Sequence, residues 1–188
     1  RKIFLEAVNN PLVELGLPQD KPLIFVTGGS FGAERLNNLL LESLDELLPN
    51  YVIFHQTGEL HQQNVQTIAT SLINDVSLLE HYFVKGSLTG HEMNLAISAA
   101  SLVISRAGAG TIYEIASKGK PSILIPIPED VSHDQTTNAY AYARTGAASV
   151  LEEHNLTDGL LASEISRIME NPETSAQMGS AATSLGTT

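Results

Sequence analysis

The 188-residue chain contains no cysteine, few basic residues and no long apolar run. Without cysteine it can form neither a disulfide nor a thiolate metal site. Ten basic residues against 21 acidic ones give a net charge of −11 with no lysine- or arginine-rich cluster, which argues against nucleic-acid binding. No run is long enough to span a bilayer and no signal peptide precedes the first predicted strand, so we expect a cytoplasmic protein.

Metal-binding and nucleophile motifs are missing as well. The six histidines are not spaced as metal ligands, and no Gly-x-Ser-x-Gly elbow is present. The sequence therefore predicts neither a metal site nor a hydrolase triad.

Short apolar runs alternate with helical patterns along the chain. The runs that predict strands are 23–26, 51–55, 82–84, 102–105, 122–126 and 148–151. This alternation predicts an α/β fold, a doubly wound and mostly parallel Rossmann-like sheet of about six strands. We expect residues 1–20 to be a linker or packing segment, residues 21–171 to be the Rossmann-like domain, and residues 172–188, rich in small residues, to be a partly disordered tail.

The stretch from Ser105 to Glu114, SRAGAGTIYE, joins a predicted strand to a helix that we expect to open at Thr111. Amides of the first helical turn and the helix dipole favour a phosphate there, and Gly108 and Gly110 let a ligand approach the backbone closely. Glu114, one turn further, can accept two hydrogen bonds from a sugar diol. The stretch indicates a nucleotide site, and an ordinary tight turn with a solvated glutamate is the alternative that stays open.

The loop after the first strand, TGGSFGA at 27–33, is a second glycine-rich turn before a helix. It does not fit the dinucleotide motif G-x-G-x-x-G, because Ser30 stands at the second glycine position and the next strand ends in His55-Gln56 instead of an acidic residue. It also lacks the Gly-Lys-Ser/Thr of a P-loop. The turn can hold a phosphate without a metal, and its alternative is a tight turn with an N-cap serine.

A third loop, 126–135, opens at the same edge of the predicted sheet, where ligands of such folds bind. It places Asp134 and Gln135 at the entrance of a helix, and Asp134 there is either a ligand contact or an N-cap. Arg106 can contact a phosphate or tie down its loop, and the residues leave this open. Three loops that carry glycine or proline at one edge of the sheet favour a binding site there.

Several motifs follow one another as in the C-terminal half of the MurG family. They are GGSFGA at 28–33 with Leu36-Asn37, HQTG at 55–58, SRAGAGT at 105–111 with Glu114, GKP at 119–121, Gln135 with Asn138-Ala139, and GAA at 146–148. The chain resembles this family from its start to about Glu170. Members are UDP-N-acetylglucosamine:N-acetylmuramyl-pentapeptide pyrophosphoryl-undecaprenol N-acetylglucosaminyltransferases of peptidoglycan synthesis.

The resemblance implies a B-type glycosyltransferase with two Rossmann-like domains, of which residues 21–171 would bind the donor, UDP-GlcNAc. Carried over by position, Ser30 and Thr111 would hold the diphosphate. The amides near Gly29 and Gly110 would assist them.

The same resemblance implies the contacts to the rest of the donor. Glu114 would take the ribose hydroxyls, and Val84 would lie against the uracil. Gln135, with Asp134 beside it, would contact the sugar hydroxyls, and Arg1 would match an arginine near the donor. The transfer would be inverting and would need neither a cofactor nor a metal, because amides and helix ends would stabilise the departing UDP.

In the family, an N-terminal half that this chain lacks binds the lipid-linked acceptor, touches the membrane and supplies the expected general base. We therefore expect two partners besides the UDP-sugar: an N-terminal acceptor-binding domain or partner subunit, and the lipid-linked acceptor bound through it. The full-length protein would be peripheral on the cytoplasmic face of the inner membrane. The isolated chain would be inactive, and no catalytic residue is assigned within it.

Departures from the family pattern keep other functions open. Phe31 replaces the usual glutamine, Glu34 stands where a basic or small residue is common, and Asp134 stands where many members have histidine or glutamine. One alternative is a separate donor subunit resembling that of the split dolichol-linked N-acetylglucosaminyltransferase. A second is a non-catalytic nucleotide-sugar-binding module, and an NAD-dependent enzyme remains only because the fold permits it.

Overall fold

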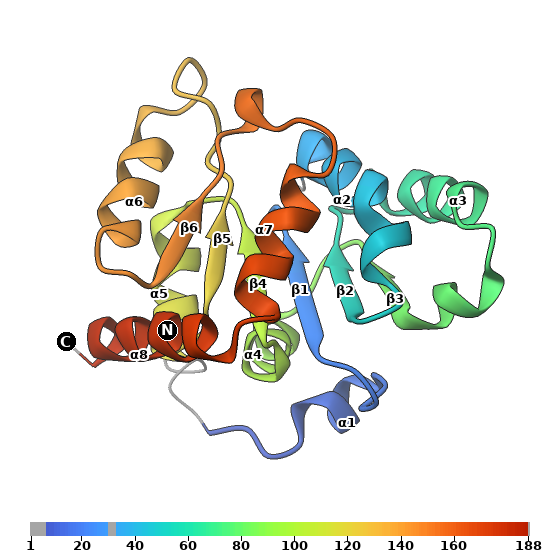
Figure 1. Cartoon of the computed structure of the whole chain (residues 1–188), viewed down its shortest axis with the longest axis horizontal. Coiled ribbons are helices and arrows are strands. Elements are labelled where there is room, and N and C mark those ends of the chain that lie inside the picture. Colours follow the sequence, from blue (N-terminus) through green and yellow to red (C-terminus); the bar gives the residue numbers. More distant parts are fainter. Residues whose placement is uncertain (1–6, 30–32, 188) are drawn as a thin grey trace.

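The computed structural model describes residues 7–29 and 33–187, which form a parallel sheet with helices on both faces (Figure 1). Its six strands are β1 (Leu23–Thr27), β2 (Val52–Gln56), β3 (Tyr82–Lys85), β4 (Leu102–Ser105), β5 (Ser122–Leu124) and β6 (Ala148–Val150). They lie in the order β3-β2-β1-β4-β5-β6, and every neighbouring pair is parallel. This is a doubly wound Rossmann order, so the predicted fold class is confirmed.

The central strand shows why these residues form a buried sheet. All five residues of β1 are buried, as expected for a strand covered on both faces. Ile24 and Val26 point into one core cluster, whereas Leu23 and Phe25 point into the other, because successive side chains of a strand alternate between faces. The continuous apolar run therefore serves two cores.

Helices cover each face of the sheet (Figure 1). On one face lie α2 (Glu34–Leu47), α3 (Gln62–Leu72) and α7 (Leu160–Met169), whose buried side chains join the cluster of Ile24 and Val26. On the other lie α1 (Pro11–Leu15), α4 (Gly90–Ala99), α5 (Ala109–Ser117) and α6 (His133–Ala143). Helix α8 (Pro172–Gly186) contributes to both clusters, because its Met178 joins the first and its Ala182 joins the second. Two short 3-10 helices, η2 (Val76–His81) and η3 (Glu153–Asn155), complete the described elements. None of the helices in the described part is both long and apolar enough to cross a membrane.

The N-terminal segment is fastened to the domain at two points. Helix α1 packs on α4, and the His91 ring lies 2.7 Å from a Glu14 carboxylate oxygen. Further along, His81 of η2 lies 2.9 Å from Asp20. These contacts lie within residues 7–20, and the linker or packing role expected for residues 1–20, with its boundary at residues 20 and 21, stays a prediction.

The expectation of a partly disordered tail at 172–188 is wrong for its described residues, because helix α8 occupies nearly all of them. Asn171 caps the helix by accepting a hydrogen bond from the Thr174 amide. The small residues serve close packing: a Cβ on Gly179 would lie 3.0 Å from the Gly119 carbonyl oxygen, and one on Gly186 would lie 2.5 Å from that of Ala116. The small residues that predicted disorder instead form a surface that lets α8 pack closely against the end of α5.

Candidate functional site

The loops that follow the strands open at one edge of the sheet. Thr27 at the end of β1 is in register with Ser105 at the end of β4, and Ser105 is in register with Leu124 of β5. The chain leaves β1 toward α2 on one face and leaves β4 toward α5 on the other face. This is the switch point at which doubly wound sheets bind ligands.

The turn after β4 and the first turn of α5 form the predicted anion site. Helix α5 begins at Ala109 with Gly108 as its N-cap, so it opens two residues before Thr111, which lies in the first turn. A Cβ on Gly110 would have no neighbour within 4 Å, and the backbone here faces open space. Within the described residues no side chain caps this helix end. First-turn amides are thus available to an anion.

Glu114 lies in the next turn of α5. Its side chain is half-buried, and this burial raises the pKa of the carboxyl group. Among the described residues none donates a hydrogen bond to this carboxylate. A partly desolvated carboxylate without such a donor can accept hydrogen bonds from a ligand's hydroxyl groups.

Gln135 links the two loops that flank this turn. Its Oε1 accepts a hydrogen bond from the Ala107 amide and another from the Ile127 amide, both at 3.1 Å. These two donors fix the orientation of the side-chain amide, so Nε2 is the group left to face Gly108, where a Cβ would lie 3.9 Å from it. Gln135 can therefore offer a ligand a donor and not an acceptor.

Asp134 is exposed in the first turn of α6, and its N-cap alternative is wrong because Ser132 occupies the N-cap position. Val84 lies inside β3 at the sheet edge, half-buried, with its side chain against the α2 and α3 core. Two strands separate β3 from β4. The proposed contacts of Asp134 and Val84 to sugar and uracil stay predictions.

The glycine turn after β1 is described up to Gly29. Gly29 has φ 88°, a left-handed conformation that favours glycine, and its amide donates a hydrogen bond to Thr27 Oγ1 at 3.1 Å. This amide is therefore already engaged by the protein, and its contact with a diphosphate stays a prediction. Ser30 and Arg1 lie outside the described residues.

Arg106 ties down its loop, which resolves the alternative that the sequence left open. Its guanidinium donates to the carbonyl oxygens of Ile125 and Pro126 at 3.2 and 3.3 Å, and it pairs with Glu153 at 3.3 Å. Both charged side chains are largely buried, with 13% of the arginine and 12% of the glutamate exposed. Arg106 thereby joins the loops after β4, β5 and β6.

Residues 23–187 match the model of the glycosyltransferase family 28 C-terminal domain. The chain belongs to this family. The predicted resemblance to MurG is confirmed by the relatives of this family 28 domain. The enzyme named UDP-N-acetylglucosamine--N-acetylmuramyl-(pentapeptide) pyrophosphoryl-undecaprenol N-acetylglucosamine transferase from Bacillus cytotoxicus is 35% identical over 173 residues, 92% of this chain and 46% of that protein.

Solved structures agree with this family 28 assignment. MurG of Acinetobacter baumannii superposes with a TM-score of 0.74 at 28% identity, over 95% of this chain and 49% of that one. Sucrose-phosphate synthase of Thermosynechococcus elongatus, with a TM-score of 0.71 at 15% identity over 96% of this chain and 44% of that one, shares the fold. The family 28 domain described here spans about half the length of the relatives it matches.

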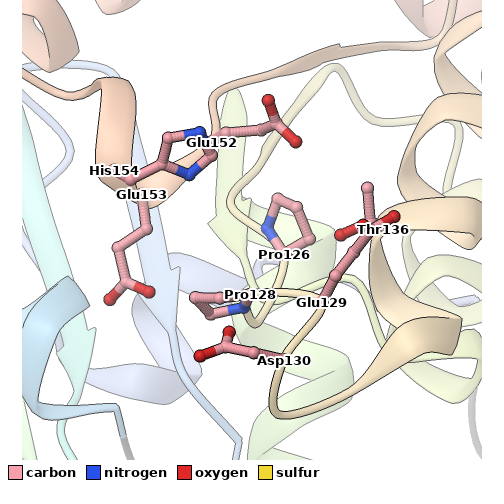
Figure 2. A pocket seen from close by; sticks show the side chains of 8 residues that line it. All are labelled: Pro126, Pro128, Glu129, Asp130, Thr136, Glu152, Glu153 and His154. Atoms are coloured by element: carbon pink, nitrogen blue, oxygen red, sulfur yellow. The ribbon is translucent and has the colours of Figure 1, made fainter.

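A pocket of about 230 Å³ lies between the loop after β5 and η3 (Figure 2). Its lining is acidic, with four carboxylates and one imidazole; it consists of Pro126, Pro128, Glu129, Asp130, Thr136, Glu152, Glu153 and His154. Such a lining repels phosphate, so the turn of α5 suits an anion better.

In the part of the chain that the structure describes, no group of three or more histidine and acidic residues is placed to hold a metal ion. Sequence reasoning missed this pocket, for which the run Glu152-Glu153-His154 was the available signal.

Proposed function

We propose that this family 28 domain binds UDP-GlcNAc as the donor-binding half of an inverting, metal-independent N-acetylglucosaminyltransferase. One observation carries the proposal: a helix start at Gly108 to Thr111, which no described side chain caps, is followed one turn later by the half-buried Glu114. The first-turn amides suit a diphosphate, and the carboxylate suits a ribose diol. The Bacillus cytotoxicus relative, whose name contains UDP-N-acetylglucosamine, supports this choice of nucleotide.

The chemistry follows from the charges around the leaving group. When an acceptor hydroxyl attacks the anomeric carbon, negative charge develops on the departing UDP. In the proposed site, the first-turn amides and the positive end of the α5 dipole would face this charge and would stabilise it without a metal. Because the whole chain carries a net charge of −11, local amides and not long-range attraction must hold the diphosphate.

The other half of the reaction needs a second domain or subunit. That part would bind the lipid-linked acceptor and supply the general base, and it would place the complex at the cytoplasmic face of the membrane. Calorimetric titration with UDP, UDP-GlcNAc, UDP-glucose and NAD in the presence of EDTA tests the donor half. We expect binding of UDP, a preference for the GlcNAc form over the glucose form, and no binding of NAD. Binding of NAD in place of UDP would contradict the proposal.

Replacing Glu114 by alanine is expected to weaken UDP binding by about 1 to 3 kcal/mol, the range for a hydrogen bond to a charged group. The side chain is half-buried on a helix surface, so the domain should still fold. Calorimetry with UDP and with 2′,3′-dideoxy-UDP separates this effect from a general one. Wild type should favour UDP, whereas Glu114→Ala should bind both ligands alike. A variant that still discriminates between them would remove Glu114 from the ribose site.

Replacing Asp134 by asparagine is expected to weaken binding of UDP-GlcNAc several-fold and to leave binding of UDP unchanged. The side chain is exposed at the start of α6, so its removal has little effect on the fold. The exposed Asp45 on α2 provides a control, and Asp45→Asn should bind both ligands as wild type does. Equal losses for UDP and UDP-GlcNAc in Asp134→Asn would refute its assignment to the sugar.

A further inference from the structure

The end of β2 carries three consecutive polar residues in the interior. His55, Gln56 and Thr57 are each at most 2% exposed. Buried polar groups of this kind need hydrogen-bond partners, because water cannot satisfy them. Their partners lie on β1, β3 and α2, and two chains of hydrogen bonds lead from them to the glycine turn.

The first chain runs across the β1–β2 pair. Thr27 and Gln56 are register partners, and the Thr27 hydroxyl donates to Gln56 Oε1 at 2.6 Å. The same hydroxyl accepts from the Gly29 amide at 3.1 Å. The hydroxyl donates its single proton to the Gln56 carbonyl oxygen, and one of its lone pairs accepts from the Gly29 amide, which can only donate.

The second chain fastens the start of α2, the helix after the glycine turn. Asn37 Nδ2 donates to the Thr57 carbonyl oxygen at 3.0 Å, which turns Asn37 Oδ1 toward His55 Nε2, 2.9 Å away. His55 must therefore carry its proton on Nε2, and the Tyr82 hydroxyl donates to Nδ1 at 2.7 Å. The end of β2 is therefore linked to Gly29 through Thr27 and to Asn37 near the start of α2.

We propose that Thr27, supported by Gln56, is a positioning residue for the diphosphate. Its hydroxyl holds Gly29 in the left-handed conformation before any ligand arrives, beside the α5 turn that follows the neighbouring strand β4. A residue whose backbone conformation is set before binding loses less conformational entropy when an anion binds beside it. Thr27 contacts Gly29 and Gln56, not the ligand, and this inference rests on the proposed donor site.

Thr27→Val tests the inference because valine fills the same buried space and suits a strand, yet lacks the hydroxyl. We expect its affinity for UDP to fall about tenfold, the effect of one net hydrogen bond. Binding of uridine, which has no phosphate, should stay unchanged when measured by ligand-observed NMR. Thr27→Ser, which keeps the hydroxyl, should bind UDP within about twofold of wild type.

A matched control removes a buried hydroxyl elsewhere. Ser43 on α2 donates to the Leu39 carbonyl oxygen at 3.1 Å and does not touch the turn, so Ser43→Ala should bind UDP as wild type does. Hydrogen exchange of the Gly29 amide gives a readout that needs no ligand. It should be slow in wild type and Thr27→Ser and fast in Thr27→Val.

The outcomes separate this inference from the proposed function. If wild type binds UDP and Thr27→Val binds it equally well, the positioning role is wrong while the donor site stands. Equal losses for UDP and uridine, or Thr27→Ser as weak as Thr27→Val, would reduce Thr27 to a general structural role. If wild type binds no uridine nucleotide, the proposed donor site is wrong. In that case hydrogen exchange still tests the hydrogen bond from the Gly29 amide to Thr27, and an unchanged exchange rate in Thr27→Val would contradict it.

Discussion

Arg106→Ala is expected to lower the free energy of unfolding by about 3 to 5 kcal/mol, the cost of breaking a buried ion pair from one side. Removing the guanidinium leaves the Glu153 carboxylate, 12% exposed, without its pair at 3.3 Å. It also takes away the donors to the carbonyl oxygens of Ile125 and Pro126. Urea unfolding followed by circular dichroism measures the change.

A surface pair in the same chain serves as the control for Arg106. Arg167 pairs with Glu164 at 2.6 Å, but 55% of its side chain is exposed, and exposed pairs contribute at most about 1 kcal/mol. Arg167→Ala should therefore lose far less stability than Arg106→Ala. The double change Arg106→Met with Glu153→Leu should recover part of the loss, because it removes the unpaired carboxylate. A loss in Arg106→Ala no larger than in Arg167→Ala would show that the buried pair does not join the three loops.

The second large effect is a dependence of stability on pH through His55. Burial lowers the pKa of His55 to about 3, against about 6.5 in an unfolded chain. Above pH 6.5 both states leave the ring neutral, and its contacts stabilise the fold fully. Between pH 6.5 and 3 only the unfolded chain takes up the proton, so stability falls as the pH is lowered, by about 1.4 kcal/mol per pH unit.

The measurement compares the free energy of unfolding of wild type and His55→Gln at pH 7, 6 and 5. Other groups titrate in this range too, so the difference between the two curves is the informative quantity. The difference should grow as the pH falls, with a slope that approaches about 1.4 kcal/mol per pH unit below pH 6. NMR of the folded wild type gives an independent check, since the His55 ring should not titrate between pH 8 and 5. A ring that titrates near pH 6.5 would contradict the prediction.

Local patterns made most of the fold predictable from the sequence. Apolar runs bounded by glycine-rich turns located all six strands to within two residues, and Leu102 to Ser105 agrees at both ends. The α5 turn was predictable for the same reason, because Gly108, Thr111 and Glu114 lie within one short stretch of chain. Their placement follows from helix geometry alone.

Contacts between distant parts of the chain were not predictable in this way. The alternatives for Arg106 depended on whether Glu153, far along the chain, lies beside it. The hydrogen bonds to Gln135 require that the amides of Ala107 and Ile127 lie close together in the fold, and the spacing of these residues in the sequence does not indicate this. The same holds for α8. A composition rich in residues such as Gly179 predicts disorder, and its role in close packing becomes visible only when the neighbouring residues in the fold are known.

The strand order has a consequence for how the domain acquires its shape. The centre of the sheet joins β1 to β4, with Ile24 opposite Leu102, so the chain must close a long loop before this pair forms. Such high contact order predicts slow folding, with one edge of β1 exposed until β4 arrives. During synthesis from the N-terminus, β2 can pair with β1 and β3 with β2, while the edge of β1 that will bind β4 stays unpaired until the second half of the chain is made.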